Sequence, residues 1–374
     1  MSGRPRPEPL GARLPDFPWD LLVPYAERAR AHPDGIVDLS VGTPVDPTPQ
    51  VVQAALAAAA DAPGYPLTAG TPLVRRACAG WLSRALGVEV EPDTQVLPTI
   101  GSKELVAGLP TLLGLGPADT VVIPEVAYPT YAVGAMVAGC RVVATDSTAA
   151  LGPEAPALLW LNSPSNPTGR VLPVEHLRKV VAWARERGTV VVSDECYIEL
   201  PWTEHSASVL HPSVCDGSHE GLLAVHSLSK RSNLAGYRFG FAAGDPALVA
   251  ALLAARKHLG LMVPAPVQAA AVAAYGDVAH VREQRDRYRW RREVLAAAMT
   301  EAGFRIDHSH AGLYLWVTRD EPCWDTVAWL AERGILVAPG DFYGAAGARH
   351  VRVALTATDE RVTAAATRLT PPSP

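Results

Sequence analysis

The sequence is short of lysine. Of its 33 Lys and Arg residues only four are lysine, namely Lys103, Lys179, Lys230 and Lys257. A chain that uses arginine for almost all of its positive charge has no general need for lysine, so each remaining amine is a candidate for chemistry. Arginine cannot replace an amine that must condense with an aldehyde, because the guanidinium stays protonated at neutral pH.

The chain also lacks paired cysteines and a surplus of positive charge. Its five cysteines are widely spaced and form no Cys-x-x-Cys pair. This argues against a zinc knuckle or a disulfide framework, and it favours reduced thiols in a cytoplasmic protein with no metal site. The net charge of −5 at pH 7 gives no electrostatic support for binding to nucleic acid or to an anionic membrane.

Long hydrophobic runs are missing as well. No uninterrupted apolar run approaches the roughly 20 residues that span a bilayer. Residues 1–15 are rich in proline and arginine and have no apolar core, so we expect no signal peptide there. With 374 residues, of which 48% are hydrophobic, the chain is predicted to fold into two domains.

Short apolar segments alternate with helical ones through the first two thirds of the chain. Strands are predicted at 95–99, 120–124, 141–145, 157–162, 189–193, 222–227 and 238–243, and helices at 18–32, 50–60, 72–86, 104–113 and 173–187. Buried strands separated by helices are typical of an α/β domain with a mainly parallel, mixed sheet flanked by helices. Ligands of such sheets bind beyond the carboxyl ends of the strands.

After residue 246 the pattern becomes mostly helical. The segment 278–302 is long enough for an interdomain helix, and it precedes strands at 312–317, 335–339 and 350–355 with helices at 324–333 and 359–369. This pattern indicates a smaller α+β domain. We therefore predict an N-terminal arm and small-domain segment (1–45), a large cofactor-binding domain (46–277) and a C-terminal small domain (278–374).

One lysine follows directly on a predicted strand. Lys230 comes after Ser227 and Ser229, whose hydroxyls suit a phosphate, and Arg238 opens the next predicted strand, where a guanidinium can bind the same phosphate with two nitrogens. The alternative is a surface turn with an ordinary lysine.

The predicted strand 189–193 is followed directly by a carboxylate, that of Asp194. A buried Asp194 needs a cationic or strongly donating partner, because an isolated charge is costly to desolvate. A protonated pyridine nitrogen is such a partner, and Tyr197 can donate its hydroxyl to a phenolate oxygen on the same ring. The alternative is an aspartate that caps a helix.

Other predicted strand ends carry polar or aromatic groups. Asn166 precedes a proline, which keeps it out of the helical region and can aim its amide at a ligand. The segment Gly101-Ser102-Lys103 opens a helix whose free amides favour an anion, and Tyr128 could lie on a planar cofactor. Each signal alone also fits a plain strand–helix loop.

In chain order, the strand ends carry a phosphate cup, an aromatic ring, an amide, a carboxylate and a lysine. This order resembles that of the fold-type I aminotransferases, which depend on pyridoxal 5′-phosphate (PLP), and the likeness covers nearly the whole chain. It implies that Lys230 forms a Schiff base with PLP and acts with Asp194 and Tyr197 in catalysis. It also implies a cofactor-binding set, namely Gly101, Ser102, Lys103, Tyr128, Asn166, Asp194, Tyr197, Ser227, Ser229, Lys230 and Arg238.

The same resemblance implies how substrate is bound and how the chain assembles. Arg352, in the segment His-Val-Arg-Val-Ala, would hold the substrate α-carboxylate, and Gly42 and Asn166 would contact the substrate. Tyr65, in Gly-Tyr-Pro, would reach the phosphate in the neighbouring subunit, which implies a homodimer.

Three segments narrow the resemblance: 14–20, 38–47 and 101–104 are similar to those of actinobacterial N-succinyldiaminopimelate aminotransferases. This implies N-succinyl-LL-2,6-diaminopimelate and 2-oxoglutarate/glutamate as substrates, in lysine biosynthesis. The candidate cations for the distal carboxylate are Lys103, Arg75, Arg170 and Arg231.

Three alternatives to this function stay open. One is an aminotransferase for aromatic amino acids, aspartate or prephenate, and another is a PLP-dependent carbon–sulfur lyase. The third is a PLP-sensing regulator, which would need a fused DNA-binding domain; we expect no room for one before Gly42.

Overall fold

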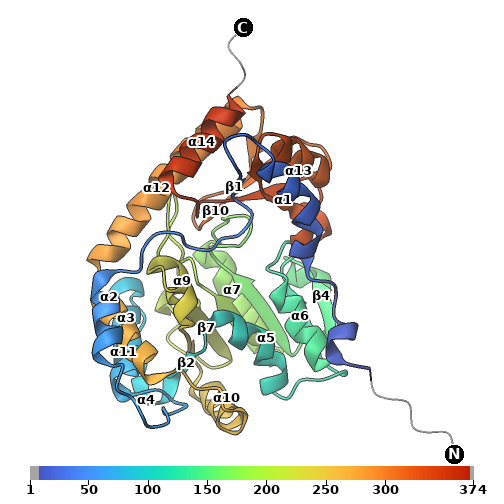
Figure 1. The fold of residues 1–374 in the computed structure, drawn as a ribbon. Coiled ribbons are helices and arrows are strands. Elements are labelled where there is room, and N and C mark those ends of the chain that lie inside the picture. The colour runs from blue at the N-terminus through green and yellow to red at the C-terminus, as the bar shows by residue number, and fades with distance from the viewer. Residues whose placement is uncertain (1–7, 371–374) are drawn as a thin grey trace, which may run out of the picture.

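The protein, described here from a computed structural model that places residues 8–370, is built on a seven-stranded sheet (Figure 1). The strand order is β2-β8-β7-β6-β5-β3-β4, in which β4, β3, β5, β6 and β7 run parallel and β8 is antiparallel to both of its neighbours. The strands are β2 (Val96–Thr99), β3 (Thr120–Ile123), β4 (Arg141–Ala144), β5 (Leu158–Asn162), β6 (Val190–Asp194), β7 (Leu222–Ser227) and β8 (Gly240–Gly244).

Helices cover both faces of this sheet. One apolar cluster joins the sheet to α3 (Pro72–Leu86), α7 (Val174–Arg185) and α11 (Ala265–Gly276), and α2 (Gln50–Ala58) packs on α11. A second cluster joins the other face to α5 (Ser102–Leu112), α6 (Thr130–Ala138) and α10 (Pro246–Leu259). The predicted fold class, a mainly parallel mixed sheet flanked by helices, is therefore confirmed.

Short elements complete this part of the chain. They are the helical turns α4 (Pro92–Gln95), α8 (Pro212–Cys215) and α9 (Leu228–Arg231), and the 3₁₀ turns Thr148–Leu151 and Ala235–Tyr237.

Local chemistry explains where the elements begin and end. Thr71 caps α3 by accepting from the backbone N–H of Val74, and α3 ends at Gly87, whose φ of 65° favours glycine. The predicted strand 238–243 begins two residues late, at Gly240, because Arg238 is left-handed with a φ of 57°. A left-handed residue cannot continue an extended strand.

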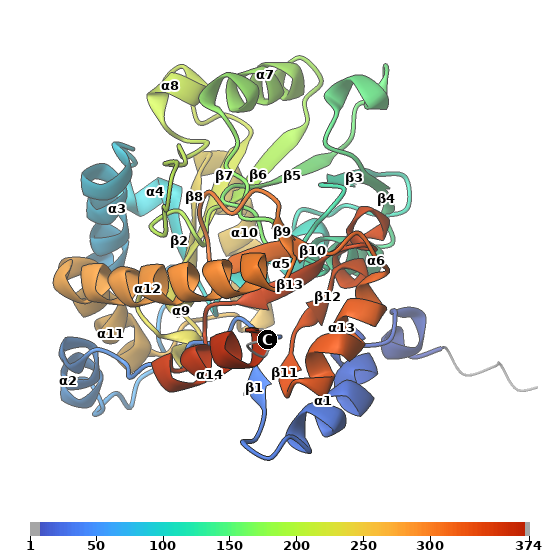
Figure 2. The same cartoon turned by 90° about the horizontal axis from the view of Figure 1, so that it is seen from above.

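A smaller antiparallel sheet lies above the first, in the order β12-β13-β10-β9 (Figure 1). Its strands are β9 (Arg305–Ile306), β10 (Tyr314–Thr318), β12 (Ala338–Pro339) and β13 (Val351–Ala354), and it packs with α12 (Ala279–Glu301), α13 (Cys323–Glu332), α14 (Asp359–Leu369) and the 3₁₀ turns Gly340–Tyr343 and Ala345–Gly347. The helices α12 and α14 lie side by side (Figure 2). Among residues 8–370, no helix is long and apolar enough to cross a membrane.

The N-terminal segment packs with this smaller part. It contains the 3₁₀ turns Leu10–Arg13 and Pro18–Leu22, helix α1 (Val23–Arg30) and strand β1 (Val37–Asp38), which pairs with β11 (Ile335–Leu336). The predicted strand 335–339 is therefore two strands, because β11 pairs with β1 whereas β12 pairs with β13. The domain boundaries after residues 45 and 277 stay a prediction.

We expect Gly134→Ala to lower the unfolding free energy by about 1–3 kcal/mol, because overpacked atoms cannot move apart without cost. A Cβ at Gly134 in α6 would lie 2.9 Å from the backbone oxygens of Val106 and Ala107 in α5. Gly108→Ala in α5 is the matched control: its Cβ would meet only the Leu112 side chain, at 3.5 Å. This control should gain about 0.5–1 kcal/mol from helix propensity. Denaturant unfolding of both variants measures the difference, and equal stabilities would contradict the close α5–α6 packing.

Candidate active site

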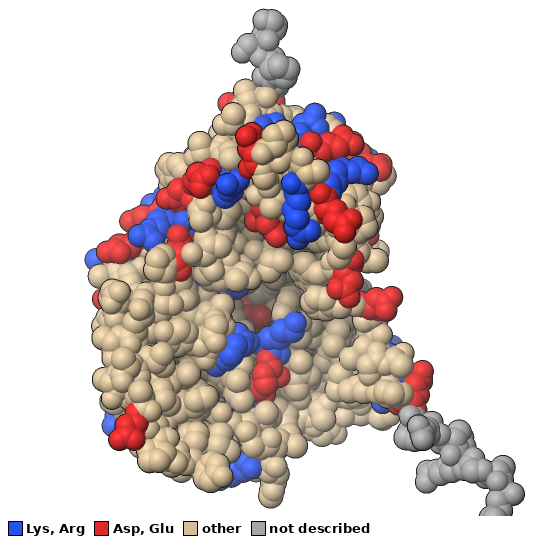
Figure 3. Space-filling view, viewed as in Figure 1, with Lys and Arg blue, Asp and Glu red and all other residues tan. Residues whose placement is uncertain are grey.

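A cavity of about 770 Å³ lies at the carboxyl ends of the large sheet's strands, below the small sheet. Figure 3 shows a hollow in this face, with Lys and Arg side chains at its edge and an acidic side chain beside them. Twelve of the predicted site residues line the cavity: Gly42, Ser102, Lys103, Tyr128, Asn166, Asp194, Tyr197, Ser227, Ser229, Lys230, Arg238 and Arg352. The chain topology thus brings together residues that are up to 310 positions apart in number.

Two predicted residues do not line it. Gly101 is next in the chain to Ser102, which does line the cavity, and a Cβ at Gly101 would overlap the guanidinium of Arg238. Tyr65 is 97% exposed. Its predicted contact with a neighbouring subunit therefore stays a prediction.

Lys230 lies on α9, directly after β7, and its Nζ donates to the backbone oxygen of Gly42. Burial in the cavity lowers the pKa of Lys230 below its usual value, against an opposing effect of Tyr314. The nearby charges of Arg352 and Arg238 lower the same pKa further. A lower pKa increases the neutral fraction of the amine, which is the form that reacts with an aldehyde or accepts a proton.

Asp194 is the last residue of β6 and is only 6% exposed. Its Oδ2 accepts from the Tyr131 hydroxyl at 2.8 Å, and its Oδ1 accepts from the Cys196 backbone N–H at 3.2 Å. Burial raises the pKa of Asp194, and these hydrogen bonds oppose the rise. No cation is ion-paired with Asp194 within residues 8–370. The carboxylate accepts a turn N–H but begins no helix, so capping does not account for it.

Arg352 reaches the cavity from β13 of the small sheet and is 3% exposed. Its Nη1 donates to Asn166 Oδ1 at 2.9 Å, and its Nη2 donates to the backbone oxygen of Ser40 at 2.6 Å. The guanidinium carbon lies 4.1 Å from the ring centroid of Tyr314. Every one of these contacts is to a neutral group, so they leave the charge of Arg352 uncompensated.

The lack of a carboxylate partner distinguishes Arg352 from the other buried arginines of the described chain. Those three are ion-paired with carboxylates: Arg231 with Glu199, Arg256 with Glu104, and Arg291 with Asp46. A buried charge without a partner is costly. A positive and a negative charge, Arg352 and Asp194, thus face the same cavity without an ion-pair partner from the described residues, which indicates that bound ligands supply the two counter-charges.

A third part of the cavity suits a phosphate. Ser227 caps α9, and its Oγ lies 3.0 Å from Ser229 Oγ and accepts from the Ser229 N–H at 3.1 Å. The first residue of α5, Ser102, follows Gly101, whose φ of 72° and contact with Arg238 both require glycine. Two serine hydroxyls, a guanidinium and a helix N-terminus thus meet here, and together they favour an anion.

Sequence reasoning missed three residues that shape the site. The Tyr131 hydroxyl binds Asp194, although Tyr131 stands in the same segment as Tyr128. Asn162, the last residue of β5, accepts from the Asn166 N–H at 2.7 Å and donates to the Asp194 backbone oxygen at 2.9 Å. Its position at a strand end was an available signal.

Tyr314 is the third, and no signal in the sequence could have found it. Its hydroxyl lies 3.1 Å from that of Tyr197, and a Cβ at Gly42 would overlap its ring. The residue comes from β10 of the small sheet, so it reaches the cavity only because the two sheets pack together.

The structure separates the four candidate distal cations. Lys103 lines the cavity, and its Nζ lies 5.9 Å from the Phe17 ring centroid. The other three do not line it: Arg75 is ion-paired with Asp93, Arg231 with Glu199, and Arg170 lies 3.9 Å from Asp146 in a different cavity.

These features fit PLP. Asp194 can hold the protonated pyridine nitrogen, and Ser227, Ser229 and Arg238 can hold the phosphate. Lys230 lies within the same 227–238 stretch, faces the same cavity and has an amine of lowered pKa. Arg352 is left for a substrate carboxylate. Within residues 8–370, no cluster of metal-ligating side chains was found.

Comparison with known proteins gives the same family. Residues 34–369 match the family model described as aminotransferase class I and II. A probable aminotransferase of Mycobacterium tuberculosis is 66% identical over 361 residues, which cover 96% of this chain and 86% of that protein. A 4-dedimethylamino-4-oxo-anhydrotetracycline transaminase of Streptomyces rimosus is 62% identical over 357 residues, covering 96% of this chain and 99% of that protein.

A solved structure is also similar. It is the N-succinyldiaminopimelate aminotransferase of Mycobacterium tuberculosis, with a TM-score of 0.85 and 27% sequence identity. The match covers 95% of this chain and 99% of that one.

We expect Asp194→Asn to stabilise the apoprotein at pH 7 while it weakens cofactor binding. The pKa of Asp194 is raised in the folded state, so its ionisation costs stability at neutral pH. This cost disappears as the pH falls below the ordinary aspartate value of 3.8, where the carboxyl is protonated in both states. The gain from asparagine should therefore be present at pH 7 and vanish in acid, as measured by denaturant unfolding of the apoprotein.

Asp245→Asn is the control for this prediction. Asp245 is also buried, but its Oδ1 accepts from the Ala247 N–H at 2.7 Å and its Oδ2 from the Gly221 N–H at 2.8 Å. Both donors to Asp245 are backbone N–H groups, which cannot accept from the new amide NH₂, so this variant should lose about 1–3 kcal/mol. At Asp194 the Tyr131 hydroxyl can turn and accept from the NH₂ of asparagine, so both contacts can be kept. A loss of apoprotein stability in Asp194→Asn would show that the carboxylate has a partner in the chain after all.

Proposed function

The chain belongs to the class I and II aminotransferases, and on this premise we propose that it transfers an amino group between N-succinyl-LL-2,6-diaminopimelate and the 2-oxoglutarate/glutamate pair in lysine biosynthesis. Enzymes of this family depend on PLP, and this chain is a PLP-dependent aminotransferase. The observation that carries the proposed site is the pair of buried charges, Arg352 and Asp194, which have no ion-pair partner among residues 8–370 and face one cavity with Lys230.

We assign the catalytic roles to three side chains. PLP, when bound, supplies an aldehyde and a protonated ring that withdraws electrons. Asp194 holds the proton on the ring nitrogen, and Arg352 binds the substrate α-carboxylate, which orients the Cα–H bond. Lys230 holds the cofactor and, as a neutral amine, moves the proton at Cα; the lowered pKa of its amine supports this role.

The remaining predicted residues would position the cofactor. Tyr197 and Asn166 would hold the phenolate side of the ring; in support, both line the cavity, and they contact Tyr314 and Arg352 of the small sheet. Tyr128 supplies an aromatic face, and Gly101 and Lys103 present backbone amides at the start of α5.

The distal carboxylate supports the choice of substrates. N-succinyl-LL-2,6-diaminopimelate and 2-oxoglutarate both carry a negative charge far from the reacting carbon, so one cation can serve both half-reactions. Apart from Lys230, Arg238 and Arg352, the cavity lining contains one basic side chain, Lys103. We assign the distal carboxylate to Lys103.

A polycyclic oxo compound is the second candidate substrate. The Streptomyces rimosus relative, 62% identical, is named for transamination of an oxo-anhydrotetracycline. One wall of the cavity is mostly apolar and partly aromatic, formed by the N-terminal residues Leu14, Pro15, Phe17, Pro18 and Trp19, with one acidic residue, Asp16, among them. Such a wall favours a flat apolar body as well as the succinyl and methylene groups of the first candidate.

We also propose a cytoplasmic homodimer. Tyr65, Leu67 and Leu73 are exposed by 97%, 64% and 56%, and such apolar exposure is typical of an interface. Tyr65 would then reach the neighbouring subunit's phosphate site. All five cysteines are free, which supports a reducing compartment.

Lys230→Ala should abolish turnover, and borohydride should no longer fix PLP to the protein. Among the described residues, the only other lysine that lines the cavity is Lys103, which is exposed. Lys257→Ala, which removes an exposed lysine on α10, is the control and should keep both properties. Absorbance of the trapped protein and a glutamate-formation assay give the result. Full turnover in Lys230→Ala would remove the assignment of this residue.

Donor specificity is tested with Lys103→Met. The yellow parent enzyme is mixed with one amino donor at a time, and bleaching of its colour reports the half-reaction; the panel holds N-succinyl-LL-2,6-diaminopimelate, glutamate, phenylalanine and cystathionine. We expect the parent to prefer the first two, and Lys103→Met to slow these two by about tenfold while phenylalanine changes little, since one partly solvated ion pair is lost.

The control for this series is Lys257→Met. Preference of the parent for phenylalanine, or pyruvate release from cystathionine without an oxo-acid acceptor, would overturn the substrate assignment. The second candidate would take its place under two results. The parent would show no bleaching with the diaminopimelate donor, and enzyme bleached by glutamate would rapidly regain its yellow colour when an oxo-anhydrotetracycline accepts the amino group.

A further inference from the structure

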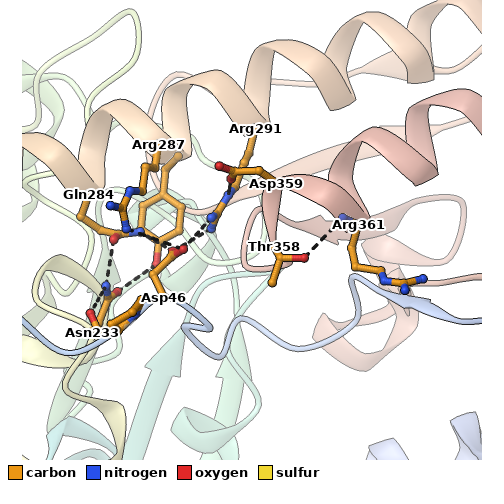
Figure 4. Close-up of polar contacts among 10 residues, drawn as sticks. Asp46, Asn233, Gln284, Arg287, Arg291, Thr358, Asp359 and Arg361 are labelled. Carbon is orange, nitrogen blue, oxygen red and sulfur yellow. Dashed lines mark hydrogen bonds and ion pairs between the residues drawn. The ribbon is translucent and has the colours of Figure 1, made fainter.

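An ion pair outside the cavity joins the N-terminal segment to α12 (Figure 4). Asp46 lies between β1 and α2, and its side chain is 10% exposed. Arg291 of α12 binds both carboxylate oxygens, with Nη2–Oδ1 at 2.6 Å and Nη1–Oδ2 at 2.8 Å. Gln284 donates to Oδ2 at 2.8 Å, and Arg287 lies 3.9 Å from Oδ1.

The carboxylate of Asp46 is held in its charged form. Burial alone would raise the pKa of Asp46, but hydrogen bonds from Arg291 and Gln284 outweigh it and leave the pKa below its usual value. A two-point contact between a guanidinium and a carboxylate also fixes orientation, because both partners are planar.

Arg291 has a second carboxylate partner on a different element. Its Nε donates at 2.7 Å to Oδ1 of Asp359, the first residue of α14. The Asp359 side chain is 58% exposed, compared with 2% for that of Arg291. The same guanidinium thus has one enclosed partner, on the N-terminal segment, and one solvated partner.

The ion pair is also connected to the loop that follows Lys230. Gln284 Oε1 accepts from Asn233 Nδ2 at 2.8 Å, and Asn233 is three residues after the lysine. The Asn233 backbone oxygen accepts from Thr48 of the N-terminal segment at 3.3 Å. Asp46 and the Lys230 loop therefore share one hydrogen-bond network (Figure 4).

The other end of the same segment contacts the reacting groups directly. The backbone oxygen of Gly42 accepts from Lys230 Nζ, and that of Ser40 accepts from Arg352 Nη2 at 2.6 Å. Residues 40–48 form no helix or strand, so no backbone ladder fixes these two oxygens in place. Between them, the backbone oxygen of Val41 accepts from Thr356 Oγ1 at 2.9 Å. The position of the two oxygens therefore depends on this contact and on the contacts at the far end of the segment, around Asp46.

We propose that Asp46 and Arg291 are positioning residues for amino transfer: their ion pair holds segment 40–48 so that the oxygens of Ser40 and Gly42 keep Arg352 and Lys230 in their reacting positions. This inference rests on the roles proposed above for Lys230 and Arg352. The geometry does not depend on which substrate is used. Arg291 binds both oxygens of Asp46, and Asp46 is four residues after Gly42, whose backbone oxygen accepts from Lys230.

The test compares Asp46→Asn with Asp359→Asn. Each variant removes one carboxylate from the same guanidinium, but only the first touches segment 40–48. We expect Asp46→Asn to lower kcat/KM on the order of 100-fold for both substrates, through misplacement of remote groups. Asp359→Asn should change it less than about threefold, because a solvated ion pair contributes little. A purely structural role would instead lower the unfolding midpoint and leave KM unchanged.

A second readout needs no substrate. Hydrogen exchange of the backbone amides in 40–48, measured in the PLP-loaded enzyme and in the apoprotein, should be faster in Asp46→Asn and unchanged in Asp359→Asn. Arg291→Lys keeps the charge but loses the fork, and should be intermediate in exchange and in kcat/KM. This variant also serves if Asp46→Asn does not fold.

The outcomes separate this inference from the proposed function. Equal losses in Asp46→Asn and Asp359→Asn, or unchanged exchange of 40–48 in both Asp46→Asn and Arg291→Lys, would overturn it. If the parent does not accept N-succinyl-LL-2,6-diaminopimelate, the substrate proposal fails, while the exchange difference and the loss measured with the preferred donor still support the positioning role.

Discussion

Burying a charged side chain without an ion-pair partner costs much free energy, and two such side chains face one cavity in the described part of this protein. Asp194 comes from β6 of the large sheet and Arg352 from β13 of the small one, and within the described residues each is hydrogen-bonded only to neutral groups. The chain elsewhere pairs its buried arginines with carboxylates. Two sheets packed on each other are needed to bring these opposite charges to one cavity, so the fold favours bound ligands that neutralise each of them.

The large sheet and most of the site could be predicted from the sequence because the signals are local. A buried parallel strand is a short apolar run, and the residue that follows it must lie at the carboxyl edge. Asn166, Asp194 and Lys230 could therefore be placed together without knowing any long-range contact. The scarcity of lysine added an independent reason to choose Lys230, since 29 of the 33 Lys and Arg residues are arginine.

What could not be predicted depends on contacts between distant segments. β1 pairs with β11 across nearly 300 residues, and this pairing splits one predicted strand into two. Arg238 looked like the first residue of a strand, but its left-handed backbone turns it out of the strand and over Gly101. Tyr314 is likewise an ordinary strand tyrosine until the small sheet meets the large one. Local patterns carry no information on such pairings.

Different parts of the cavity are assigned to the chemical reaction and to the choice of substrate. The groups to which we assign action on Cα and its carboxylate lie at strand ends or on the small sheet, whereas another side of the cavity is formed by the N-terminal segment around Phe17 and by Lys103. A substrate that keeps the amino-acid end can vary widely beyond it without disturbing Asp194, Lys230 or Arg352. An anhydrotetracycline transaminase 62% identical to this chain and a diaminopimelate enzyme of 27% identity with a TM-score of 0.85 are therefore not in conflict. Under the proposed assignment, the residues at the strand ends carry out amino transfer, and the wall around Phe17 and Lys103 selects which substrate receives or donates the amino group.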